Sequence, residues 1–201
     1  MKRKEVSGAR GRPRSFNTEK ALDGALRVFW RKGYEGAPLS DLTRAMGINR
    51  PSLYAAFGDK EALFRKALDR YMNAHACYVQ GALKEPTARA FAERLLLGAA
   101  ESMCGSGNPS GCLLVQGALA SGREADPVRR ELVSRRKAGE TAVRQRLKRA
   151  KAEGDLPSSS DPAALARYLA TVTQGMAVQA ASGASQNDLR RVAETALRAL
   201  P

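Results

Sequence analysis

The sequence is poor in the residues on which most enzyme and metal sites depend. It has one histidine and three cysteines in 201 residues, and aromatic residues make up only 5%. The cysteines, Cys77, Cys104 and Cys112, are widely spaced and form no C-x-x-C pair, which argues against a disulfide framework and a structural zinc site. Neither a Ser/His/Asp arrangement around His75 nor a phosphate-cradling glycine motif is present. We therefore expect no enzyme, no bound metal and no cofactor.

Long apolar runs and alternating apolar patterns are also missing. No stretch approaches the roughly 20 apolar residues that span a bilayer, and no apolar signal segment follows the basic N-terminus. We accordingly expect a cytoplasmic protein without a membrane partner. Runs of Val, Ile and Thr bounded by turn residues are absent as well, whereas Ala, Leu, Arg, Lys and Glu dominate. This composition predicts an all-α fold.

Positive charge is what the sequence has in excess. The chain has 34 Lys and Arg against 20 Asp and Glu, for a formal net charge of +14, so we expect it to bind polyanions. Residues 1–15 are basic and lack an apolar period, which predicts an arm that is disordered when free. Within it, residues 10–13 read Arg-Gly-Arg-Pro, as in the core of a minor-groove AT-hook. Arg12 and Arg14 are thus candidates for the minor groove, although a tail that only touches phosphates is an equal alternative.

Two short helices joined by a glycine turn are predicted between residues 40 and 57. Gly47 ends the first, because glycine tolerates the left-handed backbone of a helix stop. Asn49 can cap the second, with Pro51 in its first turn, where a missing N–H is no loss. The second helix contains no carboxylate that would repel phosphate. These proportions indicate a helix-turn-helix that places its second helix in the major groove, although a plain helical hairpin has the same spacing.

An ordered set of residues around this turn carries a family resemblance. The set comprises Met46, Gly47, Ile48, Ser52, Leu53, Tyr54, Phe57, Gly58, Lys60, Glu61, Leu63 and Phe64. In this order the residues resemble the DNA-binding domain of the TetR/AcrR family of bacterial transcription regulators. The resemblance extends back to Phe16 and covers roughly the first third of the chain closely. It departs at Ala37 and Pro38, where the family often has Thr or Ser, so we expect Ser40 to take over the helix cap.

The helix-turn-helix and the resemblance together define candidate DNA contacts. The outer side of the second helix would contact the groove and the DNA backbone. Lys60 would hold a phosphate, because it lies in the first turn of the next helix, where the helix end itself favours anions. The candidates are Arg12, Arg14, Ser40, Asn49, Arg50, Ser52, Tyr54 and Lys60. We expect an arm over residues 1–15, a three-helix DNA-binding domain over 16–62 and a helical effector-binding and dimerisation domain over 63–201.

The second domain is predicted to enclose a pocket. Helices are expected over residues 60–83, 87–103, 112–121, 126–153, 161–181 and from 186 or 187 onward. Their inward faces suit a small apolar or amphipathic effector, although each position is equally compatible with core packing. The pocket candidates are Met72, His75, Leu95, Ala99, Met103, Cys112, Val115, Gln116, Leu119, Val143, Leu147, Tyr168 and Val172.

The last two predicted helices carry small residues that would let them pack closely against a second subunit. The resemblance implies such a homodimer, and a palindromic operator follows from two-fold symmetry. Apolar residues expected at the interface are Leu165, Leu169, Met176, Leu189, Val192, Ala196 and Leu197.

The sequence thus predicts a sequence-specific, homodimeric transcription repressor that a small molecule releases from DNA. One alternative is a redox or electrophile sensor, because Cys104 and Cys112 flank a Gly/Ser loop and could meet. A position at a predicted helix start would also lower the pKa of Cys112. Another alternative is a basic architectural DNA-binding protein without an effector.

Overall fold

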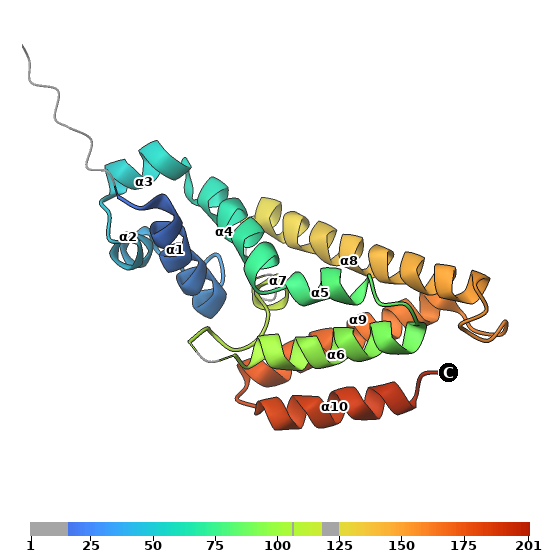
Figure 1. Ribbon diagram of the computed structural model, residues 1–201. Helices are drawn as coiled ribbons and strands as arrows, with labels where there is room; N and C mark the ends of the chain where they lie inside the picture. Colours follow the sequence, from blue (N-terminus) through green and yellow to red (C-terminus); the bar gives the residue numbers. More distant parts are fainter. Residues whose placement is uncertain (1–15, 106, 118–124) are drawn as a thin grey trace, which may run out of the picture.

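The computed structural model describes residues 16–105, 107–117 and 125–201, and these ranges contain α-helices and no strand. The all-α prediction is confirmed. Arg12, Arg14 and Leu119 lie outside the described residues. A group of three helices forms one end of the molecule, and α4 leads from it into a larger layered bundle (Figure 1). No helix within the described ranges is long and apolar enough to cross a membrane.

Three of the first four helices begin at the residues that the sequence favours. The four helices are α1 (Thr18–Lys32), α2 (Leu39–Met46), α3 (Arg50–Phe57) and α4 (Lys60–Ala74). Three of them have a side-chain oxygen that accepts a backbone N–H at 2.8 to 3.0 Å, from the N-cap residues Asn17, Asn49 and Asp59. Gly47 ends α2 in the left-handed conformation, with φ 66°. The expected cap at Ser40 is wrong: α2 starts at Leu39 behind Pro38, without a side-chain cap bond, and Ser40 lies inside the helix.

An aromatic core holds these helices together. Phe29, Trp30 and Phe64 are fully buried, and the rings of Phe29 and Phe64 meet edge to face with centroids 5.0 Å apart. The backbones of α1 and α2 also touch, because a Cβ added at Gly24 would lie 2.3 Å from the carbonyl oxygen of Ala45. Only glycine fits there. The orientation of the helix-turn-helix is thereby fixed on α1.

The helix predicted over residues 60–83 is broken in two. It stops at Ala74, and a second short helix, α5 (Cys77–Ala82), follows after a turn. The break lies at His75, whose carbonyl oxygen accepts a hydrogen bond from the Ser102 hydroxyl at 2.6 Å. The His75 ring packs against Trp30, with centroids 4.9 Å apart. Contacts from distant parts of the chain therefore replace the continuing helix.

The larger bundle contains the remaining described helices. They are α6 (Ala88–Met103), α7 (Leu113–Gln116), α8 (Asp126–Ala152), α9 (Pro162–Ala181) and α10 (Gln186–Arg198). Helices α6 and α10 lie side by side, and α8 starts next to α4 and packs along α9 (Figure 1). The described α7 is shorter than the helix predicted over 112–121. Leu113, Val128 and Leu132 from α7 and α8 belong to the same buried cluster as the aromatic core of α1 and α4. The two parts of the chain thus share a core.

Candidate DNA-binding surface and effector pocket

Helix α3 presents one buried and one open side. Leu53 and Phe57 are buried and hold the helix to the body, whereas Tyr54 is 49% exposed and Arg50 is exposed. No carboxylate of the described residues pairs with Arg50. The Asn49 side-chain oxygen caps the helix at the Ser52 N–H, 2.9 Å away, so only its amide NH₂ remains for other partners. The open side therefore offers donors and an aromatic ring without a competing negative charge.

Lys60 lies at the first position of α4, directly after α3. Its Nζ lies over the ring of Tyr34, 4.6 Å from the centroid, which is a cation–π contact. Burial lowers the pKa of Lys60, and the nearby Glu35 partly offsets this effect. Tyr34 packs edge to face on buried Phe64. The ammonium group is thereby held at a helix N-terminus, where backbone N–H groups also favour an anion.

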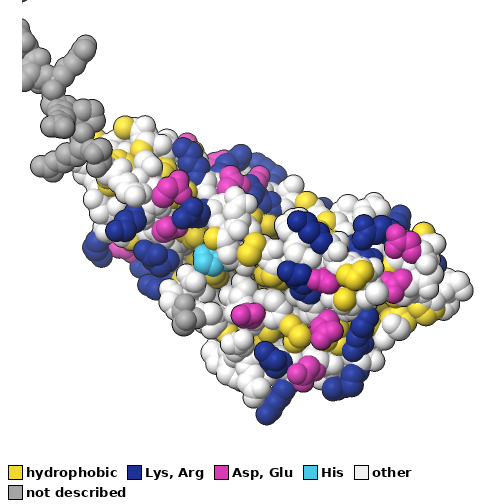
Figure 2. All heavy atoms as spheres, viewed as in Figure 1, with side chains coloured by type: hydrophobic (Ala, Val, Ile, Leu, Met, Phe, Trp, Pro, Cys, Tyr) yellow, Lys and Arg dark blue, Asp and Glu magenta, His cyan; other side chains and the backbone are white. Residues whose placement is uncertain are grey.

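Ser40 is exposed in the first turn of α2, and two further basic residues of this end were not predicted. Arg44 of α2 is 80% exposed and has only a 3.5 Å contact with Asp41. Lys66 of α4 lies over the Phe57 ring, 5.5 Å from its centroid. The sequence indicates Arg44 by one feature: it is a basic residue on the face of α2 opposite Leu42, which is buried. Figure 2 shows Lys and Arg spread over the viewed face with Asp and Glu between them, so the positive charge is not concentrated in one patch there.

A cavity of about 140 Å³ in the larger bundle is lined by residues from each of the helices α4, α5, α6, α7, α8 and α9. Six residues that the sequence predicts for an effector pocket line it: Met72, Leu95, Met103, Cys112, Val115 and Val143. The lining residues that were missed are Tyr71, Ala76, Tyr78, Val79, Leu114, Arg135, Arg136, Gly139, Glu140, Ala170, Thr173 and Gln174. The lining residues of α8 recur at helical spacing, and this spacing is visible in the sequence. Most of the missed ones are charged, however, which is typical of a solvated helix face.

The other predicted pocket residues lie elsewhere. His75 packs on Trp30, and Ala99 and Leu147 are buried in the core of the bundle. Tyr168 and Val172 pack against the same core and do not line the cavity. Gln116 does not line the cavity either, and its side-chain oxygen is buried without a hydrogen-bond partner among the described residues.

Cys112 lies in the cavity wall beside Tyr71. Its sulfur accepts a hydrogen bond from the Tyr71 hydroxyl at 3.2 Å. Burial raises the pKa of Cys112, although hydrogen bonds from Tyr71 and from the backbone of residues 114 and 115 act in the opposite direction. The expected lowering of this pKa is therefore wrong, since α7 has only four residues and the thiol is desolvated. Cys104 has a separate contact, 3.6 Å from the Ala184 carbonyl, and both cysteines are free thiols.

Ionic contacts connect the cavity wall to the DNA-binding end. Arg135 of α8 pairs with Asp69 of α4 and with Glu131, each at 2.7 Å. The next residue of α4, Arg70, forms ion pairs with Glu19 and Asp23 of α1. Tyr71 and Met72 follow in the cavity wall. Consecutive residues of α4 therefore contact α8, α1 and the cavity.

The predicted interface residues mostly pack within one protomer. Five are at most 5% exposed and bury α9 and α10 against the rest of the bundle: Leu169, Met176, Leu189, Ala196 and Leu197. Leu165 is half-buried against the same core. Val192 is 43% exposed, and Val178 of α9, which was not predicted, is 44% exposed. The outer side of α9 and α10 thus carries these two valines.

A capped, acid-free helix behind a glycine turn, joined by α4 to a helical bundle with a cavity, defines a helix-turn-helix DNA-binding protein with a further helical part. Family models confirm this class. Residues 21–67 match the N-terminal model of "Bacterial regulatory proteins, tetR family", and residues 86–196 match "Tetracyclin repressor-like, C-terminal domain". The chain belongs to the TetR family of bacterial regulatory proteins.

Individual relatives agree over the full length. The chain is 34% identical over 198 residues to the HTH-type transcriptional repressor ComR of Escherichia coli, covering 98% of this chain and 94% of ComR. It is 30% identical over 208 residues to the HTH-type transcriptional repressor BdcR of the same organism, covering 100% and 97%. Among solved structures, a cysteine mutant of the TetR family regulator CifR, complexed with 26 bp double-strand operator DNA, is 43% identical. That match has a TM-score of 0.90 and covers 94% of this chain and 100% of the CifR chain.

Proposed function

We propose that the protein is a homodimeric transcriptional repressor that binds a palindromic operator and is released by a small molecule in the cavity. The observation that carries the proposal is the open side of α3, where Arg50 is exposed without a carboxylate partner among the described residues. ComR and BdcR are named transcriptional repressors, and the CifR mutant is complexed with operator DNA. Since these relatives are regulators, we infer a non-catalytic role.

Each DNA-binding candidate takes a role that follows from its position. Arg50 and Tyr54 would enter the major groove, because they are the exposed long side chains of α3. Asn49, Ser52 and Ser40 would donate to the DNA backbone. Lys60 would hold a phosphate at the start of α4. Arg12 and Arg14 remain proposals for the minor groove.

We propose that two copies associate through the outer side of α9 and α10. The support is the pair of exposed valines, Val178 and Val192, on helices whose other large apolar residues are buried or half-buried. Gly175 lies on the same side of α9, with open space around it, so a partner helix could approach closely there. Two-fold association would place two α3 helices on successive half-sites of the operator.

The proposed switch acts through α4. This helix carries Tyr71 and Met72 in the cavity wall and also leads to α3. A ligand can shift the protein between two arrangements only if it binds one of them more tightly. We infer that the ligand favours a position of α4 that does not fit two half-sites together.

Footprinting of the purified chain on genomic fragments tests the proposal. Protection of a short palindrome at low protein concentration is the expected result. Uniform coverage without a preferred site would instead identify a basic architectural protein. Competition with random DNA at several salt concentrations separates the two, because charge-driven binding falls steeply with salt for every sequence.

A second candidate is an electrophile-responsive repressor that reacts through Cys112, whose sulfur lies in the cavity wall. Because burial raises the pKa of Cys112, its thiolate fraction at neutral pH is lower than that of an ordinary thiol, and it increases as the pH rises. Iodoacetamide should therefore label exposed Cys77 faster than Cys112 at pH 7, and the difference should narrow at higher pH. Mass spectrometry measures both sites. Loss of a quinone response on operator DNA in Cys112→Ser, but not in Cys77→Ser, would support this candidate.

A further inference from the structure

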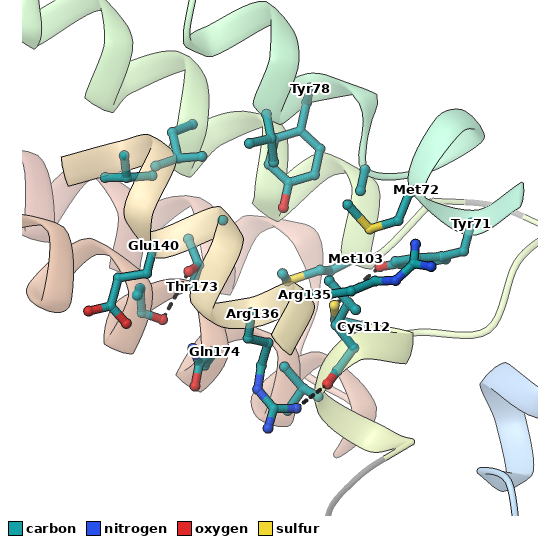
Figure 3. Close-up of a pocket in the computed structure, with 18 residues that line it drawn as sticks. Tyr71, Met72, Tyr78, Met103, Cys112, Arg135, Arg136, Glu140, Thr173 and Gln174 are labelled. Atoms are coloured by element: carbon teal, nitrogen blue, oxygen red, sulfur yellow. Dashed lines mark hydrogen bonds between the residues drawn. The ribbon is translucent and has the colours of Figure 1, made fainter. Parts of the chain in front are cut away.

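Tyr78 is a polar side chain of the cavity wall whose hydroxyl lacks a partner among the described residues. Its ring extends from α5, and its hydroxyl points into the cavity toward Met103 (Figure 3). No described residue forms a hydrogen bond with this hydroxyl. By contrast, the hydroxyl of Tyr71 donates to Cys112 and that of Thr173 donates to Leu169. A donor that faces a mostly apolar space without an acceptor is a place where a ligand can gain a hydrogen bond.

A glycine on the neighbouring helix fixes the position of Tyr78. A Cβ added at Gly98 of α6 would lie 2.9 Å from the Tyr78 Cβ and 3.0 Å from its Cδ2. Real Cβ atoms do not approach so closely, so the phenol ring lies where Gly98 leaves room for it. Glycine inside a helix costs about 0.5–1 kcal/mol relative to alanine. The close packing of the Tyr78 ring against α6 explains why residue 98 is glycine.

Two of the three charged residues of the cavity wall form ion pairs. Arg135 pairs with Asp69 and Glu131, and Glu140 pairs with Arg167 at 2.7 Å. The guanidinium of Arg136 donates to the Leu114 carbonyl and points away from Tyr78 (Figure 3). An ionic ligand next to Tyr78 would lose its hydration, and the wall charge that has no ion-pair partner among the described residues, Arg136, points away from it. The inner part of the cavity therefore favours a neutral molecule.

The volume indicates how large a group the inner part of the cavity can hold. At about 140 Å³ the cavity is close to the roughly 150 Å³ of an engineered apolar cavity that binds benzene. Leu95, Met103 and Val143 form much of the wall, and the two methionines of the lining, Met72 and Met103, adapt readily to different shapes. A ring or branched chain of about six to ten heavy atoms fits this space.

We propose that the cavity binds a compact, uncharged, largely apolar molecule with one hydrogen-bond acceptor, and that the Tyr78 hydroxyl donates to this acceptor. The proposal names the ligand class of the site on which the proposed function depends. Burial raises the pKa of Tyr78, so the phenol keeps the proton that it donates. The ligand would also contact Tyr71 and Met72 of α4, the helix that leads to the DNA-binding end.

Three probes of similar size separate the possible ligand classes. Cyclohexanone has an acceptor, methylcyclohexane has none, and cyclohexanecarboxylate is an anion. Isothermal titration calorimetry of the full chain should show cyclohexanone binding about five-fold more tightly than methylcyclohexane, the effect of one net hydrogen bond, and no binding of the carboxylate. Tyr78→Phe should abolish the preference for the ketone and leave methylcyclohexane binding unchanged. Tyr168→Phe, which alters a tyrosine outside the cavity lining, should retain the preference for the ketone.

The proposal is overturned if the carboxylate binds most tightly, if Tyr78→Phe retains the ketone preference, or if none of the probes binds at millimolar concentration. Because calorimetry needs no DNA, the two proposals can fail separately. A chain that binds its operator but no probe contradicts the ligand class alone. A chain that binds cyclohexanone but protects no operator contradicts the proposed function alone.

Discussion

Asp69 and Arg135 form a 2.7 Å ion pair between α4 and the α8 face that lines the cavity. This pair connects the wall of the proposed ligand site to α4, the helix that carries Lys60 at its start. We expect Asp69→Asn to weaken the response of operator binding to cyclohexanone by roughly two- to five-fold, the range of a modest coupling energy. Stability should fall by only about 0.5 kcal/mol, because the Asp69 side chain is more than half exposed.

Glu61→Gln provides the matched control for this prediction. It removes another partly exposed ion pair, between Glu61 and Arg65, that lies within α4 alone. Operator titrations with and without cyclohexanone measure the response, and thermal unfolding measures stability. Equal loss of response in both variants would show that the α4–α8 connection has no special part in it.

Replacing Arg50 or Lys60 by alanine should weaken DNA binding in two different ways. Arg50→Ala should weaken operator binding roughly ten-fold while changing binding to random DNA much less, since groove contacts carry sequence information. Lys60→Ala should weaken both and lower the slope of log K against log salt by about one, because one phosphate contact is lost. Fluorescence anisotropy at several salt concentrations measures these quantities. Parallel losses for Arg50→Ala on both DNAs would place Arg50 on the DNA backbone instead.

Val192→Arg should separate the two copies. The change places a charge in the proposed interface of α9 and α10 and needs no repacking of the protomer, because the side chain is 43% exposed. We expect monomers by analytical ultracentrifugation, near-normal thermal stability of the helices, and loss of high-affinity operator binding. Gln80→Arg, at an exposed position of α5, is the control and should remain dimeric. A dimeric Val192→Arg would move the interface to another surface.

Gly24→Ala should destabilise the DNA-binding end. The new Cβ would lie 2.3 Å from the Ala45 carbonyl oxygen, so α1 and α2 would have to separate, at a cost of about 2 kcal/mol or more. Gly139→Ala in α8 meets open space and should raise stability by up to about 1 kcal/mol through helix propensity. Chemical denaturation of both variants measures the difference. Equal stability changes would mean that α1 and α2 can move apart freely.

Local signals made the helix-turn-helix predictable. The stop at Gly47, the cap at Asn49 and the inward pair of Leu53 and Phe57 each depend on neighbours within four residues, and the structure has all of them. Ser40 was misjudged as a cap because α2 begins one residue earlier, behind a proline that supplies no side-chain oxygen.

Features that depend on distant partners could not be predicted. The break at His75 requires Ser102 and Trp30, and neither is recognisable from the local apolar period. Arg135 and Glu140 line a largely apolar cavity because Asp69 and Arg167, far away in the chain, compensate their charges. The same limit explains the interface residues, since an apolar side chain in a sequence does not reveal whether it faces its own protomer or another.

The order of contacts along α4 restricts how this helix can move. Successive side chains of an α-helix point about 100° apart, so residues 69 to 72 face every side of α4 in turn. Rotation about the helix axis would pull Asp69 from Arg135, Arg70 from Asp23 and Tyr71 from Cys112 simultaneously. We therefore expect any movement of α4 to be a tilt or shift of the whole helix and not a rotation about its own axis.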